Sequence, residues 1–338
     1  MKQKALFLFV SLLIPLSAEV RRVTEQTLNW RCAAWWGPEG SVEAAKELGF
    51  NAIIAGFFGE RLTKAVKDGT SNGVDIYLDI EFLGGGKYTQ VMTDDEEELI
   101  KRKRAASAPD VATWEPGKRG DPLGLRLWCF ARPEAIEHGK KKIRQYLPNF
   151  DVHGVCLDAI GYRNQYGCFC EFCRKRLQEL AEKNPDVDRK ALHDRFSEQS
   201  LSRFITELAE FARKLSPGVK IAVHIEPTFV PNPTFASKLP IDYWMTSVSY
   251  YSKPHWPLET VRKLSRLVAD APGKAVGVPY IGFIAGKSAK SAKVMAEEVQ
   301  AVCVSGSAGI ALFELGEIVK SAKVTDAVKE ALADRGKD

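Results

Sequence analysis

The sequence predicts one α/β domain folded as a single (β/α)8 barrel, the TIM-barrel architecture. From residue 31 onward, eight short β-rich segments alternate with longer helical segments, a pattern that builds a parallel sheet. No linker interrupts this alternation. The turn after the first strand, residues 35–39, reads Trp-Trp-Gly-Pro-Glu, whereas a doubly wound open sheet usually has a glycine-rich phosphate turn there.

The predicted strands are 31–36, 51–57, 73–82, 152–160, 219–226, 241–250, 275–280 and 308–314. The clearest predicted helices are 41–48, 133–147, 170–183, 201–215 and 288–304. Ser41 and Gly49 are typical caps for the two ends of the first helix. Two long connections, 84–125 and 162–172, follow the third and fourth strands. Both therefore leave the carboxyl ends of strands, where barrel enzymes place their active sites.

The charge pattern does not indicate a nucleic-acid partner. The formal net charge is +5, with a pI near 8.7. The densest run of basic residues, 101–104, follows a run of acidic residues, 94–98. Acidic side chains therefore stand at the start of a predicted helix and basic side chains at its end, which complements the helix dipole. No aromatic residues are interleaved with these basic residues, so we expect a solvated helix here and not a nucleic-acid-binding patch.

The first residues predict export. Lys2 and Lys4 precede an apolar run, 5–16, which ends in Ser17-Ala18, as in a secretory signal peptide. We therefore expect a signal peptide at 1–18, a barrel at 19–338, and a secreted or periplasmic protein without a membrane span after cleavage. A retained anchor is the alternative, because a leucine stands third before the cleavage point. The sequence does not indicate the oligomeric state.

Asp158 is the leading candidate for chemistry. It ends the apolar strand 152–160, and a buried acid is costly unless it is paired, hydrogen-bonded or used. Capping the next helix or pairing with Arg163 are the structural alternatives. Its strand-end position favours a functional role.

Two segments resemble a known group. Residues 128–134 read Trp-Cys-Phe-Ala-Arg-Pro-Glu, and residues 154–162 read Gly-Val-Cys-Leu-Asp-Ala-Ile-Gly-Tyr. These are similar to the segments Trp-Cys-x-x-x-Pro-Glu and Gly-x-x-Leu-Asp-x-x-x-Tyr of glycoside hydrolase-like (β/α)8 barrels. Some of those families continue with Cys-x-Cys-x-x-Cys at the start of a helix, as residues 168–173 do here. The resemblance implies a barrel that acts on carbohydrate, and 131–133 depart from the commoner Pro-Asn-Pro.

Glycoside hydrolysis normally needs two carboxyl groups, which lie about 5 Å apart in retaining enzymes. Glu226, at the end of the fifth predicted strand, is the first candidate for the acid/base beside Asp158 as nucleophile. The segment Leu-Asp-Ala at 157–159 also resembles the α-amylase superfamily, which carries its Asp nucleophile after strand four and its Glu acid after strand five. A salt bridge to a loop base is the alternative role for Glu226. Glu314, at the end of the eighth strand, is the reserve acid.

Other strand-end residues are candidates for binding the substrate. Asp79 and Glu81 share one face of their strand by period two, so they would bind sugar hydroxyls or cap a loop. Arg163 and His224 lie beside the candidate acids. Sugar rings stack on aromatic planes, and aromatic residues recur at or just beyond strand ends: Trp35, Trp36, Tyr162, Tyr250, Tyr251, Trp256 and Tyr280.

Three of the seven cysteines are clustered, at Cys168, Cys170 and Cys173. They are close enough in sequence to bind a structural zinc ion, with the fourth ligand from Cys129 or a histidine. A disulfide from Cys129 to one member of the cluster is the alternative. No catalytic metal or other cofactor is expected, because the five histidines form neither His-x-His nor His-Glu-x-x-His.

The sequence supports three functional hypotheses. The first is a retaining glycosidase. The second is a non-catalytic carbohydrate-binding barrel, which would keep the aromatic rim without a working acid pair. The third is a lyase or isomerase for phosphorylated metabolites, which needs a phosphate-binding turn near strands seven and eight. The one candidate turn, 305–309, precedes the eighth strand and so lies at the wrong end of the barrel.

Overall fold

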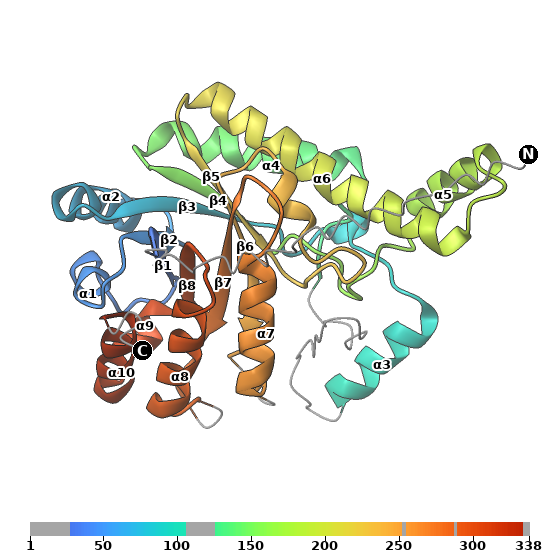
Figure 1. The fold of residues 1–338 in the computed structure, drawn as a ribbon. Helices are drawn as coiled ribbons and strands as arrows, with labels where there is room; N and C mark the ends of the chain where they lie inside the picture. The colour runs from blue at the N-terminus through green and yellow to red at the C-terminus, as the bar shows by residue number, and fades with distance from the viewer. Residues whose placement is uncertain (1–27, 106–125, 252–254, 287–288, 334–338) are drawn as a thin grey trace, which may run out of the picture.

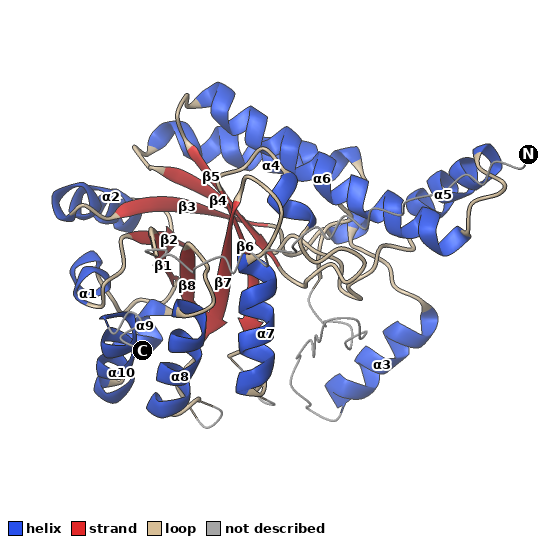
Figure 2. Cartoon of the chain, in the orientation of Figure 1, coloured by secondary structure: helices blue, strands red, loops and turns tan. Residues whose placement is uncertain are grey.

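The computed structural model describes residues 28–105, 126–251, 255–286 and 289–333. Eight parallel strands close into a barrel in sequence order, which confirms the predicted fold class (Figures 1 and 2). The strands are β1 Trp30–Trp35, β2 Ala52–Ala55, β3 Asp75–Glu81, β4 Gly154–Asp158, β5 Lys220–Ile225, β6 Tyr243–Ser249, β7 Val276–Gly282 and β8 Gly309–Phe313. The predicted signal peptide, 1–18, lies outside the described residues.

Helices surround the barrel, as Figure 2 shows. They are α1 Val42–Glu47, α2 Glu60–Asn72, α3 Asp94–Ala105, α4 Pro133–Tyr146, α5 Glu171–Lys183, α6 Arg189–Leu215, α7 Leu258–Ala269, α8 Ala292–Cys303, α9 Leu315–Val319 and α10 Ala322–Ala333. Ser41 caps α1, as predicted, because its hydroxyl accepts a hydrogen bond from the Ala44 amide. None of the described helices is both long enough and apolar enough to span a membrane.

The barrel interior changes from apolar to polar along the strands. Its apolar layer is a buried cluster that includes Tyr77 of β3, Cys156 of β4 and Ala222 of β5. Alternate residues of a strand point to the same face. Two residues further along, the same face of these three strands therefore carries Asp79, Asp158 and His224. The polar layer lies at the carboxyl ends of the strands.

Helix α6 is longer than the sequence predicted. The prediction began a helix at residue 201, whereas α6 begins at Arg189, where the Asp188 carboxylate accepts a hydrogen bond from the Ala191 amide. Figure 1 shows that α5 and the first part of α6 project away from the barrel. Residues 189–200 do not pack along the strands, so they lack the strong apolar stripe by which a barrel-covering helix is recognised.

Candidate active site

Asp158 and Glu226 line the same pocket. This pocket, of about 200 Å³, opens at the carboxyl ends of the strands. Asp158 is the last residue of β4 and is 7% exposed. Glu226 follows β5 directly, and its side chain is 14% exposed. The wall of the pocket consists of Trp36, Glu81, Leu83, Asp158, Ala159, His224, Glu226, Ser247, Ser249, Tyr250, Tyr251, Tyr280, Gly282, Ile284 and Phe313.

His224 lies between the two acids. Its Nδ1 is 2.6 Å from Oδ1 of Asp158, and its Nε2 is 3.6 Å from Oε2 of Glu226. Burial alone would lower the His224 pKa, but the hydrogen bond and charge of Asp158, with the charge of Glu226, outweigh it and raise the pKa. The protonated imidazole is therefore stabilised chiefly by the Asp158 carboxylate at Nδ1, whereas Nε2 makes no hydrogen bond among the described residues.

Glu226 is a buried carboxyl group with a raised pKa. Burial raises its pKa, and this effect outweighs the opposing charge of His224 and the hydrogen bond from the Ser247 hydroxyl. The Ser247 Oγ lies 2.5 Å from Glu226 Oε2. A carboxyl group with a raised pKa keeps its proton closer to neutral pH, as proton donation requires.

The backbone turns sharply next to Asp158. Ala159 has a φ of 58°, the left-handed conformation that residues other than glycine seldom adopt. Such conformations cluster at functional sites, where the surrounding structure holds them. The turn ends the alternation of β4 and leaves Asp158 at the exit of the strand.

Aromatic side chains form much of the pocket wall. The ring of Tyr280 lies 4.3 Å from that of His224, measured between centroids. Tyr250 stacks on Tyr251 at 4.5 Å, and Trp36 packs edge-on against Phe313 at 5.0 Å. Four of the predicted rim aromatics therefore line this pocket: Trp36, Tyr250, Tyr251 and Tyr280.

A buried ion pair holds another part of the wall. The Lys290 ammonium donates to Glu298 at 2.8 Å, to the Ser249 hydroxyl at 2.6 Å and to the Gly282 carbonyl at 2.7 Å. The Lys290 side chain is fully buried. Ser249 ends β6 and Gly282 ends β7, so this pair ties two wall-forming strand ends to α8.

Asp79 and Glu81 face a second cavity of about 180 Å³, which shares Trp36 and Glu81 with the pocket. Lys142 of α4 also lines it and donates to the Glu81 carbonyl at 2.7 Å. Burial, and then the charge of Asp158, raise the pKa of both carboxyl groups. Asp79 is the more buried, and its Oδ1 has no hydrogen-bond partner among the described residues.

The raised pKa of Asp79 makes stability depend on pH. A group with a raised folded-state pKa contributes stability that is complete below its unfolded pKa and is lost as pH rises through the folded one. We therefore expect the stability of Asp79→Asn, relative to wild type, to rise progressively as pH increases above about 4, the pKa of an unfolded Asp. Urea denaturation as a function of pH measures it, with Asp75→Asn, half-exposed on the same strand, as control. Parallel profiles for Asp79→Asn and wild type would contradict the expectation.

Four predicted site residues do not line the pocket: Asp79, which faces the second cavity, Tyr162, Arg163 and Glu314. The Tyr162 ring is buried, and its hydroxyl donates to the Ser197 carbonyl of α6 at 3.1 Å. Arg163 pairs with Glu97 at 3.3 Å. The prediction placed Tyr162 among the aromatic residues beyond the strand ends, and it placed Arg163 beside Asp158 as a substrate-binding candidate or an ion-pair partner.

Glu314 is occupied by backbone hydrogen bonds. Its carboxylate accepts from the amides of Trp36 and Gly37 at 2.8 and 3.0 Å, and from the Glu317 amide at 3.2 Å. The reserve acid therefore caps α9 and fixes the turn that carries Trp36.

Several pocket residues were missed by the sequence reasoning. Ser247 and Ser249 follow Met245 at period two on β6, so the alternation that singled out Asp79 and Glu81 would also have found them. Lys142 and Lys290 could not be found this way, because they reach the site from α4 and from the residues before α8.

Four cysteines meet beside the two long connections. Cys129 precedes α4, and its Sγ lies 3.7 Å from that of Cys170 and 3.5 Å from that of Cys173. All four Sγ atoms, including that of Cys168, lie within 4.8 Å of one another and are buried. All seven cysteines are free thiols.

This cluster fits a metal ion. Tetrahedral zinc thiolate sites have Zn–S distances of about 2.3 Å, which place the sulfurs about 3.8 Å apart. The Val91 and Cys170 amides also point at the Cys168 sulfur, at 3.4 and 3.5 Å, as amides do toward metal-bound thiolates. Cys129 thus joins the three predicted ligands.

No family model and no curated protein sequence matches the chain. A PgaB glycoside hydrolase domain from Bordetella bronchiseptica matches with a TM-score of 0.60 and 12% identity, over 91% of this chain and 99% of that one. A β-galactosidase from Marinomonas ef1 matches with a TM-score of 0.55 and 10% identity, over 90% of this chain and 59% of that one.

A GH42 β-galactosidase from G. stearothermophilus matches with a TM-score of 0.55 and 12% identity, over 90% of this chain and 56% of that one. The chain thus spans just over half the length of these two β-galactosidases. These structural neighbours are glycoside hydrolases, and at 10–12% identity the similarity shows the shared barrel fold.

Proposed function

We propose that this chain is a secreted retaining glycoside hydrolase acting on a poly- or oligosaccharide. The observation that carries the proposal is the convergence of Asp158 and Glu226, from adjacent strands, on the two nitrogens of His224 within one aromatic-lined pocket. Glycoside hydrolysis needs two carboxyl groups, and barrel enzymes place such groups at the carboxyl ends of their strands. The glycoside hydrolase neighbours support the substrate class.

In the first step, an Asp158 oxygen attacks the anomeric carbon while the bond to the leaving oxygen breaks. Glu226 gives its proton to that oxygen, so the leaving sugar departs neutral. In the second step, Glu226 takes a proton from water as the water oxygen attacks the anomeric carbon, and the bond to Asp158 breaks. His224 holds Asp158 in place through its 2.6 Å hydrogen bond.

Export belongs to the same proposal. Residues 1–18 have the basic start, short apolar run and small terminal residues of a signal peptide, and an exported hydrolase would meet polysaccharide outside the cytoplasm. Cleavage after Ala18, measured by mass spectrometry of the exported protein, tests this part.

We also infer that Cys129, Cys168, Cys170 and Cys173 hold a structural zinc ion. A bound zinc ion would cross-link the segments that carry these cysteines and would take no part in the hydrolysis. The site would join the segment after β3, which carries Cys129, to the segment after β4, which carries the other three.

The acid role of Glu226 is tested with Glu226→Gln. We expect kcat/KM on an oligosaccharide found by screening to fall about 10²–10⁴-fold, because Gln donates no proton. An aryl glycoside of the same sugar, whose leaving group needs little protonation, should lose less. Wild-type activity should fall as pH rises through the raised pKa of Glu226, and the variant should lack this alkaline limb.

The configuration of the first-formed product, read by NMR, tests retention directly. An inverted product would remove the nucleophile role of Asp158 from the proposal. Equal losses on the oligosaccharide and the aryl glycoside would remove the acid role of Glu226.

A further inference from the structure

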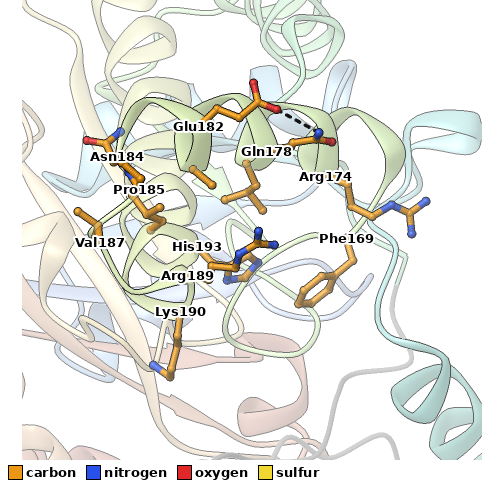
Figure 3. A pocket seen from close by; sticks show the side chains of 13 residues that line it. Phe169, Arg174, Gln178, Glu182, Asn184, Pro185, Val187, Arg189, Lys190 and His193 are labelled. Atoms are coloured by element: carbon orange, nitrogen blue, oxygen red, sulfur yellow. Dashed lines mark hydrogen bonds between the residues drawn. The ribbon is translucent and has the colours of Figure 1, made fainter.

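A larger cavity, of about 940 Å³, lies away from the barrel mouth, between α5 and the first turns of α6 (Figure 3). It shares no residue with the pocket around Asp158. Figure 1 shows these two helices projecting from the barrel, so the cavity belongs to a part of the chain that does not build the candidate active site.

The wall of this cavity offers flat and apolar surfaces. Phe169 stacks on His193, with ring centroids 4.9 Å apart and planes 11° from parallel. Leu177 and Ala181 of α5 and Leu192 of α6 also line the cavity. Such surfaces receive the C–H faces of sugar rings.

The rim carries two arginines without ionic partners. Neither Arg174 nor Arg189 has a carboxylate within salt-bridge distance among the described residues, and both are exposed. Lys190 extends away from them in Figure 3 and pairs with Asp194 at 2.6 Å. The guanidinium group matches a carboxylate with two parallel hydrogen bonds, so this rim favours an anionic ligand.

Two further titratable residues, His193 and Glu182, lie in the wall. The Nε2 of His193 is buried on the side of Gly167 and lacks a hydrogen-bond partner among the described residues, so His193 offers the cavity its ring and not this nitrogen. Glu182, the one acid in the wall, accepts a hydrogen bond from Gln178 at 3.1 Å.

We propose that this cavity is a second carbohydrate-binding site, selective for an oligosaccharide that carries carboxylate groups, that is, one built from uronic acids. The aromatic and apolar surfaces receive the ring faces, and the two arginines bind the carboxylates. This proposal is independent of the proposed catalytic role of the barrel pocket, because the cavity and the pocket share no residue.

Trigalacturonate is the probe, titrated by calorimetry into the full chain carrying Asp158→Asn, so that hydrolysis is not part of the readout. We expect the added double change Arg174→Gln/Arg189→Gln to weaken binding at least about 10-fold, as expected for lost hydrogen bonds between charged groups. The control is Arg176→Gln, because Arg176 lies on the same helix, is bound to Glu179 at 2.7 Å and does not line the cavity. Its affinity should be unchanged.

Two further ligands separate the possible occupants. Methyl-esterified trigalacturonate keeps the sugar rings and loses the charges, so it should bind at least about 10-fold more weakly. Tetraglutamate keeps charges without sugar rings, and binding as tight as that of trigalacturonate would make the cavity a docking site for acidic peptides and overturn the proposal. Absence of trigalacturonate binding, or equal binding by the double variant, would also overturn it.

Discussion

Replacing Asp158 with Asn is expected to reduce kcat/KM by about 10⁴-fold, which corresponds to about 5.5 kcal/mol of transition-state stabilisation. The loss is large because the Asn amide cannot form the covalent glycosyl-enzyme intermediate on which the proposed retaining mechanism depends. Asn keeps the shape of the side chain and removes its nucleophilic oxygen, so the thermal unfolding midpoint should change little. Kinetics on the oligosaccharide found by screening, with unfolding followed in parallel, measure both quantities.

Asp158→Ala adds a positive test. The shorter side chain leaves room for azide, which should restore turnover and yield a glycosyl azide whose configuration is opposite to that of the normal product. Asp68→Asn is the matched control, because Asp68 pairs with Lys64 on the surface of α2. A variant with more than a tenth of wild-type activity would contradict the nucleophile role.

The same variants distinguish the non-catalytic alternative. A carbohydrate-binding barrel would bind its glycan without hydrolysing it, and Asp158→Asn would leave the affinity nearly unchanged. A hydrolase should instead bind the glycan and lose turnover. The two functions therefore differ in the wild type before any variant is made.

The sequence predicted the barrel and the central acids because both follow from strand periodicity. Alternating segments specify a parallel barrel, and period-two counting places Asp79 and Asp158 on the interior face near the strand ends. The prediction that the candidate acids lie on adjacent strands needed only the strand order, and β4 and β5 are neighbours.

Residues beyond the strand ends could not be placed by counting. Ala159 takes a left-handed conformation, so the direction of the chain changes before Tyr162, and that ring packs against α6. Glu314 has a strand-end position like that of Asp158, yet its oxygens meet backbone amides from the turn after β1. Such contacts depend on where distant segments lie, which local sequence does not encode.

The cysteine cluster was predictable from the sequence only in part. The spacing of 168–173 predicted three ligands on one segment, and the fourth had two candidates because a loop can bring it from elsewhere. The structure brings Cys129 to the cluster through the isolated bridge between Thr89 and Trp128, which draws the segment before α4 against the segment after β3.

Zinc removal is the second change expected to have a large effect. We expect one zinc ion per purified chain, and loss of the ion in Cys173→Ser. Structural zinc stabilises the folded state by several kcal/mol, so chelation or this substitution should lower the unfolding midpoint by about 10 °C in a protein of this size. Elemental analysis and thermal unfolding measure the two effects. Cys303→Ser is the control, because Cys303 lies at the end of α8, outside the cluster.

Thiol titration distinguishes zinc from the disulfide alternative. A chain denatured with a chelator and without reductant should release all seven thiols if the cluster binds zinc. A disulfide from Cys129 to the cluster would occupy two, leaving seven minus two, or five. The sulfur distances of 3.5–3.7 Å favour the first result, because a metal ion is the species that stabilises buried thiolates at that spacing. Five reactive thiols and no bound metal would replace the zinc site with a covalent cross-link between the same two segments.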